Sequence, residues 1–351
     1  MNTEAGSVQS LDASIQQTHE PLSGVVELLQ GVTFGSDGLR YRRLDVQAQL
    51  HRFIEPVYFH AFVSDELVGV YVLDKRQLLV DGKRLNGYYR GALAVDEYWQ
   101  GRGVGARMAQ AAMLWLEGQA QGQTILSYGC IDTSNHRSLK LLKQLGARHG
   151  AVLSMYLMYR QLPSSRCTLT PMNSSLLQAA SSLSDEVYND CRVRDVSQSS
   201  LPGYAVLDDE GIVVSARVVT TRFCIQEMGL VARLCTRLFV TPFPVARRRF
   251  NPHNFTYVSL SNVTLREGCE NRWRDFVSAV LHELDCHFAV VYVDRQSLLF
   301  QRLQKANWFT RWAHSGAGSI QLMCSAFGPD KPAVLAACEA DAKSHLWPLD
   351  A

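Results

Sequence analysis

The sequence predicts an α+β (mixed α/β) fold built from two similar units, each a mostly antiparallel mixed sheet flanked by helices. Three observations predict it. Short β-rich runs joined by acidic or glycine turns follow one another from Tyr58 to Val95. A helical pattern begins at Val104, with apolar residues at spacings of three and four. The same order of strand and helix patterns recurs in the second half, which favours two copies of one fold.

The first unit is expected to open with two short helices and two hairpins. An acidic turn joins the strands of the first hairpin. The Asp81-Gly82 pair in the second hairpin is a strong type I′ turn signal. The helices are expected at 25–29 and 45–53, and the strands at 59–63, 67–73, 77–80 and 84–95.

A glycine-rich turn joins the last of these strands to the helix that begins at Val104. The apolar run from Ala92 stops at Asp96, and glycines follow at 101, 103 and 105. Glycine reaches positive φ and lets a ligand approach the main chain closely. A strand, a glycine turn and a helix in this order point free backbone N–H groups at an anion. The same loop satisfies the dinucleotide pattern G-x-G-x-x-G/A through Ala106, but a β-meander precedes it where that site requires a βαβ unit.

The segment Gln100-Gly-Arg-Gly-Val-Gly105 is similar to the Q/R-x-x-G-x-G/A signature of the GNAT superfamily of acyl-CoA N-acyltransferases. An apolar strand at 124–131 follows, and then Asn135 opens a helix that ends at Gly146, which resembles the family's second motif. The resemblance covers roughly residues 25–160. It implies an acyl-CoA co-substrate, acetyl-CoA by default, whose pyrophosphate is held by the N–H groups of the loop.

The resemblance also implies which residues hold the coenzyme. The central strand would line the pantetheine arm and offer main-chain N–H groups to the oxyanion of the reaction. Arg102 and Arg107 either add charge near the phosphates or are solvated residues of the first helical turn. Asn135 either contacts the coenzyme A arm or only caps its helix. The implied set is Leu93, Ala94, Val95, Gln100, Gly101, Arg102, Gly103, Val104, Gly105 and Asn135.

The catalytic acid and base are less well defined. Many family members carry a Tyr on the helix after the Asn, and that position falls on Leu142 here. Tyr128 on the preceding strand is the substitute acid, or simply a half-buried strand tyrosine. Tyr89 stands where several relatives hold a Glu. Glu97, beside Asp96 at the strand end, is a base acting through water, or only a carboxylate near the positive end of the helix.

The pattern divides the chain into a disordered leader (1–24), a GNAT-like acyl-CoA-binding catalytic domain (25–161), a linker rich in Pro, Ser and Thr (162–175), a degenerate GNAT-like domain (176–328), and a C-terminal helix and tail (329–351). The second copy has Arg266-Glu-Gly-Cys-Glu-Asn-Arg272 where the first has its glycine loop. Two acids repel a pyrophosphate, so we expect this copy to have kept the fold and lost coenzyme A.

Composition excludes several other classes of protein. A net charge of +2 on 351 residues does not favour nucleic-acid or membrane binding. Nine cysteines without a C-x-x-C pair indicate reduced thiols in a cytoplasmic protein. No metal site is expected, because His282 and His287 are spaced at i, i+5 and point about 140° apart on a helix.

These observations predict a cytoplasmic tandem protein that transfers an acetyl group from acetyl-CoA, or another acyl group from its acyl-CoA, to a primary amine. The acceptor is a small molecule or a protein amine. The degenerate copy caps the acceptor cleft, stabilises the first copy or mediates pairing as a homodimer. The alternatives are a non-catalytic acyl-CoA-binding or sensing protein and, with less support, an NAD(P)-dependent oxidoreductase. The latter needs an acidic residue about 20 positions after the loop, and Asp132 lies somewhat late for it.

Overall fold

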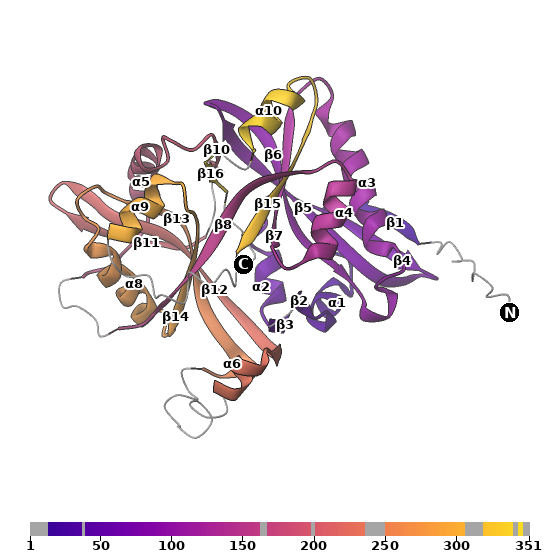
Figure 1. The fold of residues 1–351 in the computed structure, drawn as a ribbon, viewed down its shortest axis with the longest axis horizontal. Helices are drawn as coiled ribbons and strands as arrows, with labels where there is room; N and C mark the ends of the chain where they lie inside the picture. The colour runs from indigo at the N-terminus through magenta and orange to yellow at the C-terminus, as the bar shows by residue number, and fades with distance from the viewer. Residues whose placement is uncertain are drawn as a thin grey trace.

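The computed structural model describes residues 13–36, 39–161, 167–197, 201–235, 250–305, 319–339 and 343–346. These residues form a 16-stranded mixed sheet that runs through the whole molecule, with helices packed on its faces (Figure 1). Most neighbouring strands are antiparallel; the parallel pairs are β6 with β7, β13 with β14 and β10 with β16. The predicted mixed α/β class is therefore confirmed.

The first half contains the predicted helices, hairpins and central strand. The two expected strands at 67–73 and 77–80 are one long strand, β5, and the Asp81-Gly82 turn joins it to β6. The elements are β1 (Ser14–Thr18), α1 (Val25–Gly31), β2 (Phe34–Ser36), β3 (Leu39–Arg43), α2 (Val46–Leu50), β4 (Pro56–Val63), β5 (Glu66–Val80), β6 (Lys83–Val95), η1 (Glu97–Trp99), α3 (Val104–Ala120), β7 (Ile125–Asp132), α4 (His136–Gln144) and β8 (Arg148–Tyr159).

The second half repeats this order from its long hairpin onward. A helix again follows the third strand of the meander, and a parallel strand and a short helix follow in turn. The elements are β9 (Thr170–Pro171), α5 (Ser174–Val187), β10 (Val193–Asp195), β11 (Gly203–Asp208), β12 (Gly211–Met228), α6 (Leu230–Cys235), η3 (Pro252–Asn254), β13 (Phe255–Leu265), α8 (Arg272–Glu283), β14 (Phe288–Asp294), α9 (Leu298–Lys305), β15 (Ile320–Phe327), α10 (Lys331–Ala337) and β16 (Ser344–His345).

The two halves exchange a strand at the centre of the sheet. The strand order there is β6-β7-β15-β8-β14-β13. β8 follows α4 in the chain, yet it pairs with β14 of the second half, from Leu153↔Asp294 to Tyr159↔Phe288. β15 follows α9, yet it pairs with β7 of the first half along its whole length. Each half therefore completes its sheet with a strand from the other.

Three of the expected segments differ in part from the structure. Residues 14–18, expected to be part of a disordered leader, form β1, because they pair antiparallel with β4 and cover an edge that would otherwise be open. The expected C-terminal helix is α10, which ends at Ala337, and residues 344–345 of the expected helix-and-tail segment form a strand that pairs with β10. The described part of the expected linker includes β9, which pairs with β11. Residues 1–12 and 162–166 lie outside the described part of the chain.

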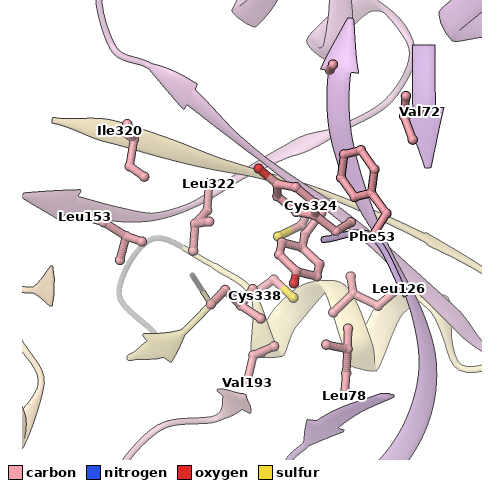
Figure 2. Close-up of a cluster of buried hydrophobic side chains, with 14 of the residues drawn as sticks. Phe53, Val72, Leu78, Leu126, Leu153, Val193, Ile320, Leu322, Cys324 and Cys338 are labelled. Carbon is pink, nitrogen blue, oxygen red and sulfur yellow. The ribbon is translucent and has the colours of Figure 1, made fainter. Parts of the chain in front are cut away.

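Separate apolar clusters cover the two faces of the first half. On one face α3 packs against alternate residues of β4 and β5, including Tyr71 and Leu73. On the other face α1, α2 and α10 pack against the intervening residues, such as Val70 and Val72. Figure 2 shows this second cluster, in which side chains from β15 and β10 and that of Cys338, just after α10, meet those of β5 and β7. The central strands are thus held from both sides. Among the described helices, none is long and apolar enough to cross a bilayer.

Candidate functional site

The strands β6 and β7 pair only near their beginnings and then part. Their parallel register runs from Asn86↔Ile125 to Tyr89↔Tyr128. β6 continues to Val95, and β7 continues to Asp132 while pairing on its other side with β15. A V-shaped separation, here called the fork, therefore opens after Tyr89 and Tyr128. Along the fork the edge of β6 that faces β7 has no strand partner among the described residues.

A β-bulge marks the base of the fork. The register between β5 and β6 shifts between Tyr71↔Leu93 and Leu73↔Arg90, so β6 carries one extra residue there. A Cβ added to Gly91 would lie 2.9 Å from Cζ of Phe53, so glycine is required for this close packing. A bulge disrupts the ladder and re-aims the backbone locally. The fork thus begins at the bulge, where the backbone N–H and C=O groups of β6 depart from regular strand pairing.

The glycine loop lies at the opposite end of the fork. Gly101 and Gly103 have φ values of 80° and 87°, which favour glycine, and a Cβ at either would meet nothing within 4 Å. Gly103 is the N-cap of α3, and its carbonyl accepts the N–H of Arg107 at 3.1 Å. Within the described chain, no acceptor is recorded for the N–H groups of residues 101–106. These N–H groups, here called the cradle, are the orphan donors of a helix start and suit an anion.

The two polar side chains of the loop support its shape. The backbone N–H of Gln100 donates to the carbonyl of Asp96 at 3.1 Å, and its side-chain amide donates to the carbonyl of Val95 at 3.0 Å. Gln100 therefore holds the turn and does not present a free N–H, unlike the expectation from sequence. The guanidinium of Arg102 lies 4.3 Å from the ring centroid of Tyr98, which positions its charge beside the cradle.

The other expected cofactor residues lie around the fork. Leu93 and Val95 face α3 and are partly buried, whereas Ala94 faces the opposite cluster. Val104 is buried and anchors the first turn of α3. Asn135 caps α4, because its Oδ1 accepts the N–H of Ser138 at 3.1 Å. Asn135 therefore acts as the N-cap of α4, one of the two roles expected for it.

The two candidate tyrosines lie at the base of the fork and are buried. Tyr128 has 0% exposed area, and its hydroxyl donates to Oδ2 of Asp195 at 2.9 Å. Its ring centroid lies 5.4 Å from that of Tyr89. Burial, reinforced by the charge of Asp195, raises the pKa of Tyr128 well above its usual value of 10. The phenol therefore stays protonated. Its proton is donated to the carboxylate of Asp195, 67 residues away in the chain.

Glu97 lies at the other end of the fork from the tyrosines. It begins the short turn η1 beyond Val95, and its carboxylate is 3.8 Å from the guanidinium of Arg42. A strand rises about 3.3 Å per residue, so Glu97 is about 20 Å along the chain from Gly91. The carboxylate is therefore well away from the bulge. The neighbouring Asp96 caps the same turn by accepting the N–H of Tyr98 at 2.9 Å.

Sequence reasoning missed Arg90, which occupies the base of the fork. Its side chain is 5% exposed, and its Nε donates to Oγ of Ser127 at 3.0 Å. Its stem lies over Gly129, where an added Cβ would come within 3.1 Å of Cβ of Arg90. The available signal was an arginine as the one charged residue in the run 87–95 of β6, because such a residue is rarely buried without a reason.

The corresponding loop of the second half is built differently from the cradle. Its turn, between β13 and α8, uses its own N–H groups: Cys269 donates to Arg266, Arg272 to Cys269 and Trp273 to Glu270, at 3.2, 2.9 and 3.3 Å. Glu267 also brings a carboxylate to this turn. Its internal hydrogen bonds and its carboxylate distinguish this turn from residues 101–106, and both features disfavour an anion.

A comparison with protein families gives a match in the first half of the chain. The model described as the acetyltransferase (GNAT) family matches residues 25–147. These residues form a GNAT domain. The domain contains the fork, the bulge and the cradle. An antiparallel hairpin precedes its glycine loop, which gives no support to the dinucleotide-binding alternative. Comparison with curated protein sequences gives no match.

Solved structures share the fold of the GNAT domain together with the second half. N-myristoyltransferase of Saccharomyces cerevisiae with bound myristoyl-CoA aligns with a TM-score of 0.59 and 9% identity, over 89% of this chain and 82% of that one. A GCN5-related N-acetyltransferase from Anabaena variabilis aligns with a TM-score of 0.50 and 11% identity, over 89% and 72%. Both alignments extend well beyond the GNAT domain, so the second half belongs to the shared architecture.

Proposed function

We propose that the protein is an acyl-CoA-dependent N-acyltransferase that moves an acetyl group from acetyl-CoA to a primary amine. The observation that carries this proposal is the row of N–H groups at residues 101–106, which lack an acceptor among the described residues, beside an edge of β6 that lacks a strand partner there. A diphosphate fits the first and an extended amide-containing arm fits the second. Gly91 and Val95 are about 13 Å apart along the strand, a span that suits the pantetheine arm of the coenzyme.

The reaction requires a stabilised oxyanion at the base of the fork. The amine attacks the thioester carbon, the carbonyl oxygen becomes negative, and the C–S bond then breaks. Main-chain N–H groups turned by the bulge at Gly91 and Ala92 are the donors that we assign to the oxyanion. Loss of one such donor typically costs about 3 kcal/mol of transition-state stabilisation. Glu97 is too far from this point to serve as the base, so the amine proton leaves through solvent at the acceptor side.

A non-catalytic acyl-CoA-binding protein is the second candidate. Two observations favour it: Leu142 packs against Met323 at the position where relatives carry a tyrosine acid, and Tyr128 is held by Asp195. In that case acyl-CoA would occupy the cradle and remain intact. The two candidates differ in whether any amine releases coenzyme A.

The first test asks whether the cradle holds the coenzyme. Thermal shifts are measured with coenzyme A and with acyl-CoAs of rising chain length, since one structural neighbour carries myristoyl-CoA. We expect stabilisation that Gly103→Asp abolishes, because the new carboxylate repels the diphosphate and occupies open space at positive φ. Gly118→Asp is the matched control, as Gly118 is exposed on the same helix and an added Cβ there meets nothing within 4 Å. An unchanged shift with Gly103→Asp contradicts the proposal.

The second test separates the enzyme from the binding protein. Free thiol is followed with time after acetyl-CoA is added to the protein and a panel of small amines and peptides. Release that depends on one class of amine, and that Gly103→Asp abolishes, supports the transferase. Stable binding for hours with no release across the panel supports the binding protein.

A further inference from the structure

Arg90 is a buried cation without a counter-ion among the described residues. Its three recorded hydrogen bonds reach neutral oxygens: Oγ of Ser127 at 3.0 Å, the carbonyl of Ser127 at 3.4 Å and the carbonyl of Met323 at 3.5 Å. The buried Arg76, by contrast, pairs with Asp74. Burial lowers the pKa of Arg90 below its usual value, yet an arginine keeps its proton in proteins. A buried charge of this kind costs folding free energy unless something compensates it.

The position of Arg90 links that charge to the fork. Arg90 is the first residue of β6 after the pairing with β7 ends. Its stem crosses Gly129, the first residue of β7 beyond the same point, and its guanidinium reaches Met323 on β15. Met323 packs against Leu142 of α4. The guanidinium therefore lies at the base of the fork, on the side covered by α3 and α4.

This inference rests on the proposed function, which places the sulfur of acyl-CoA at the base of the fork. We propose that Arg90 stabilises the coenzyme A thiolate as it leaves. In the step, the N–C bond forms, the C–S bond breaks, and the bonding electron pair remains on sulfur. The amine loses its proton to solvent. The thiolate departs as an anion beside the guanidinium and takes up a proton only on release.

Such a charge removes the need for a proton donor at the leaving group. A guanidinium beside a thiol lowers the thiol pKa, as cationic neighbours do for reactive cysteines. This accounts for the two features that favour the binding protein, because neither a tyrosine at Leu142 nor a free hydroxyl on Tyr128 is then required. It also gives the unpaired buried charge a partner that is present only during the reaction.

The experiment measures the pKa of the coenzyme A thiol in its complex with the full-length protein. Binding of coenzyme A is first established by calorimetry, and the thiolate is then titrated by its ultraviolet absorbance. Free coenzyme A, titrated in the same buffer without protein, gives the reference pKa of the thiol. We expect the bound thiol to titrate at least one unit lower in the wild type and in Arg90→Lys, and to lose that shift in Arg90→Met and Arg90→Gln, two neutral variants of similar length. Ser127→Ala, which removes a neutral acceptor and keeps the charge, should retain the lowered value.

The outcomes separate the two proposals. A wild-type complex whose thiol titrates at the free value, or a low value that persists in a neutral Arg90 variant, overturns the role of Arg90 and leaves the transferase proposal intact. Absence of coenzyme A binding to the wild type overturns both. In steady state, neutral variants that bind coenzyme A with wild-type affinity should lose kcat by 10-fold or more with KM for acetyl-CoA little changed. Where a neutral variant does not fold, a wild-type thiol that titrates at the free value still overturns the role of Arg90.

Discussion

His60 links the stability of the GNAT domain to pH through its burial. It lies on β4 with 0% exposed area, and its Nε2 accepts the N–H of Leu22 at 3.4 Å. Burial, the largest influence, lowers the pKa of His60 from 6.5 and outweighs an opposing hydrogen bond with the backbone of Gln16. The unfolded chain therefore binds a proton at a higher pH than the folded protein does. The stability that His60 contributes is complete above pH 6.5 and is lost as the pH falls through its folded pKa.

We predict that the free energy of unfolding falls between pH 7.5 and pH 5, by about 1.4 kcal/mol for each unit of difference between the two pKa values. His60→Phe keeps an aromatic ring and removes the titration, so its unfolding free energy should fall less over the same range. Urea denaturation at several pH values measures this. His282→Gln, which changes an exposed histidine, is the control and should follow the wild type. An equal acid slope in His60→Phe and wild type would contradict the assignment.

The sequence predicted the roles of some residues of the candidate site and not of others. The glycine loop was predictable because its function lies in backbone geometry that glycine spacing reports directly. The role of Tyr128 was not, since its partner Asp195 comes from a strand of the other half. Arg90 was overlooked because a strand pattern predicts which face of the sheet a side chain occupies. It does not predict whether an acidic residue lies next to that side chain.

Among the secondary-structure elements, β1 has the most direct effect on the cradle. It pairs with β4 from Ser14↔Phe62 to Thr18↔Tyr58, and the carbonyl of Ala13 accepts a hydrogen bond from Arg107 of α3 at 3.3 Å. The strand thus covers a sheet edge and holds the first turn of α3 in place. Without it, β4 would present unpaired backbone groups to other chains.

We predict that deletion of residues 1–18 lowers the melting temperature and promotes aggregation, whereas deletion of residues 1–11 leaves both unchanged. The longer deletion should also weaken coenzyme A binding several-fold, because Arg107 loses its acceptor beside the cradle. Differential scanning calorimetry and light scattering on the two truncated chains measure the effect. Equal behaviour of the two deletions would show that β1 contributes nothing to the edge.

The meander, the Asp-Gly turn, α3 and α4 could all be located from sequence. Each has a local signature: period-two runs, a turn dipeptide, helical spacing, and an Asn at a helix start. β1 was missed because a single edge strand of polar residues, with the sequence Ser-Ile-Gln-Gln-Thr, lacks the apolar alternation that identifies a half-buried strand. The strand exchange was missed because periodicity does not specify which partner a strand chooses.

The exchange of β8 and β15 makes the molecule a single folding unit. β8 completes the sheet of the second half, and β15 lies between β7 and β8. Further contacts cross the same boundary: β10 pairs with β5, and Arg192 forms an ion pair with Asp81 at 2.6 Å. In the first half alone, β7 would lose β15 and β8 would lose β14. Each would then expose an unpaired edge at the centre of the sheet.

We predict that residues 1–161 and residues 167–351, expressed separately, are insoluble or lack cooperative unfolding, and that co-expression restores a soluble complex. The intact protein should unfold in a single transition by circular dichroism and by tryptophan fluorescence. A first fragment that folds alone and binds coenzyme A with full affinity would contradict this dependence, and two separate transitions in the intact chain would do the same.

Hydrogen–deuterium exchange with and without acetyl-CoA tests the central claim most directly, because it reports on the amides themselves. We predict that the coenzyme slows exchange at residues 101–106 of the cradle, and that exchange at residues 267–273 of the corresponding loop stays unchanged. Unchanged exchange across the cradle at saturating acetyl-CoA, or protection confined to the second loop, would contradict the account.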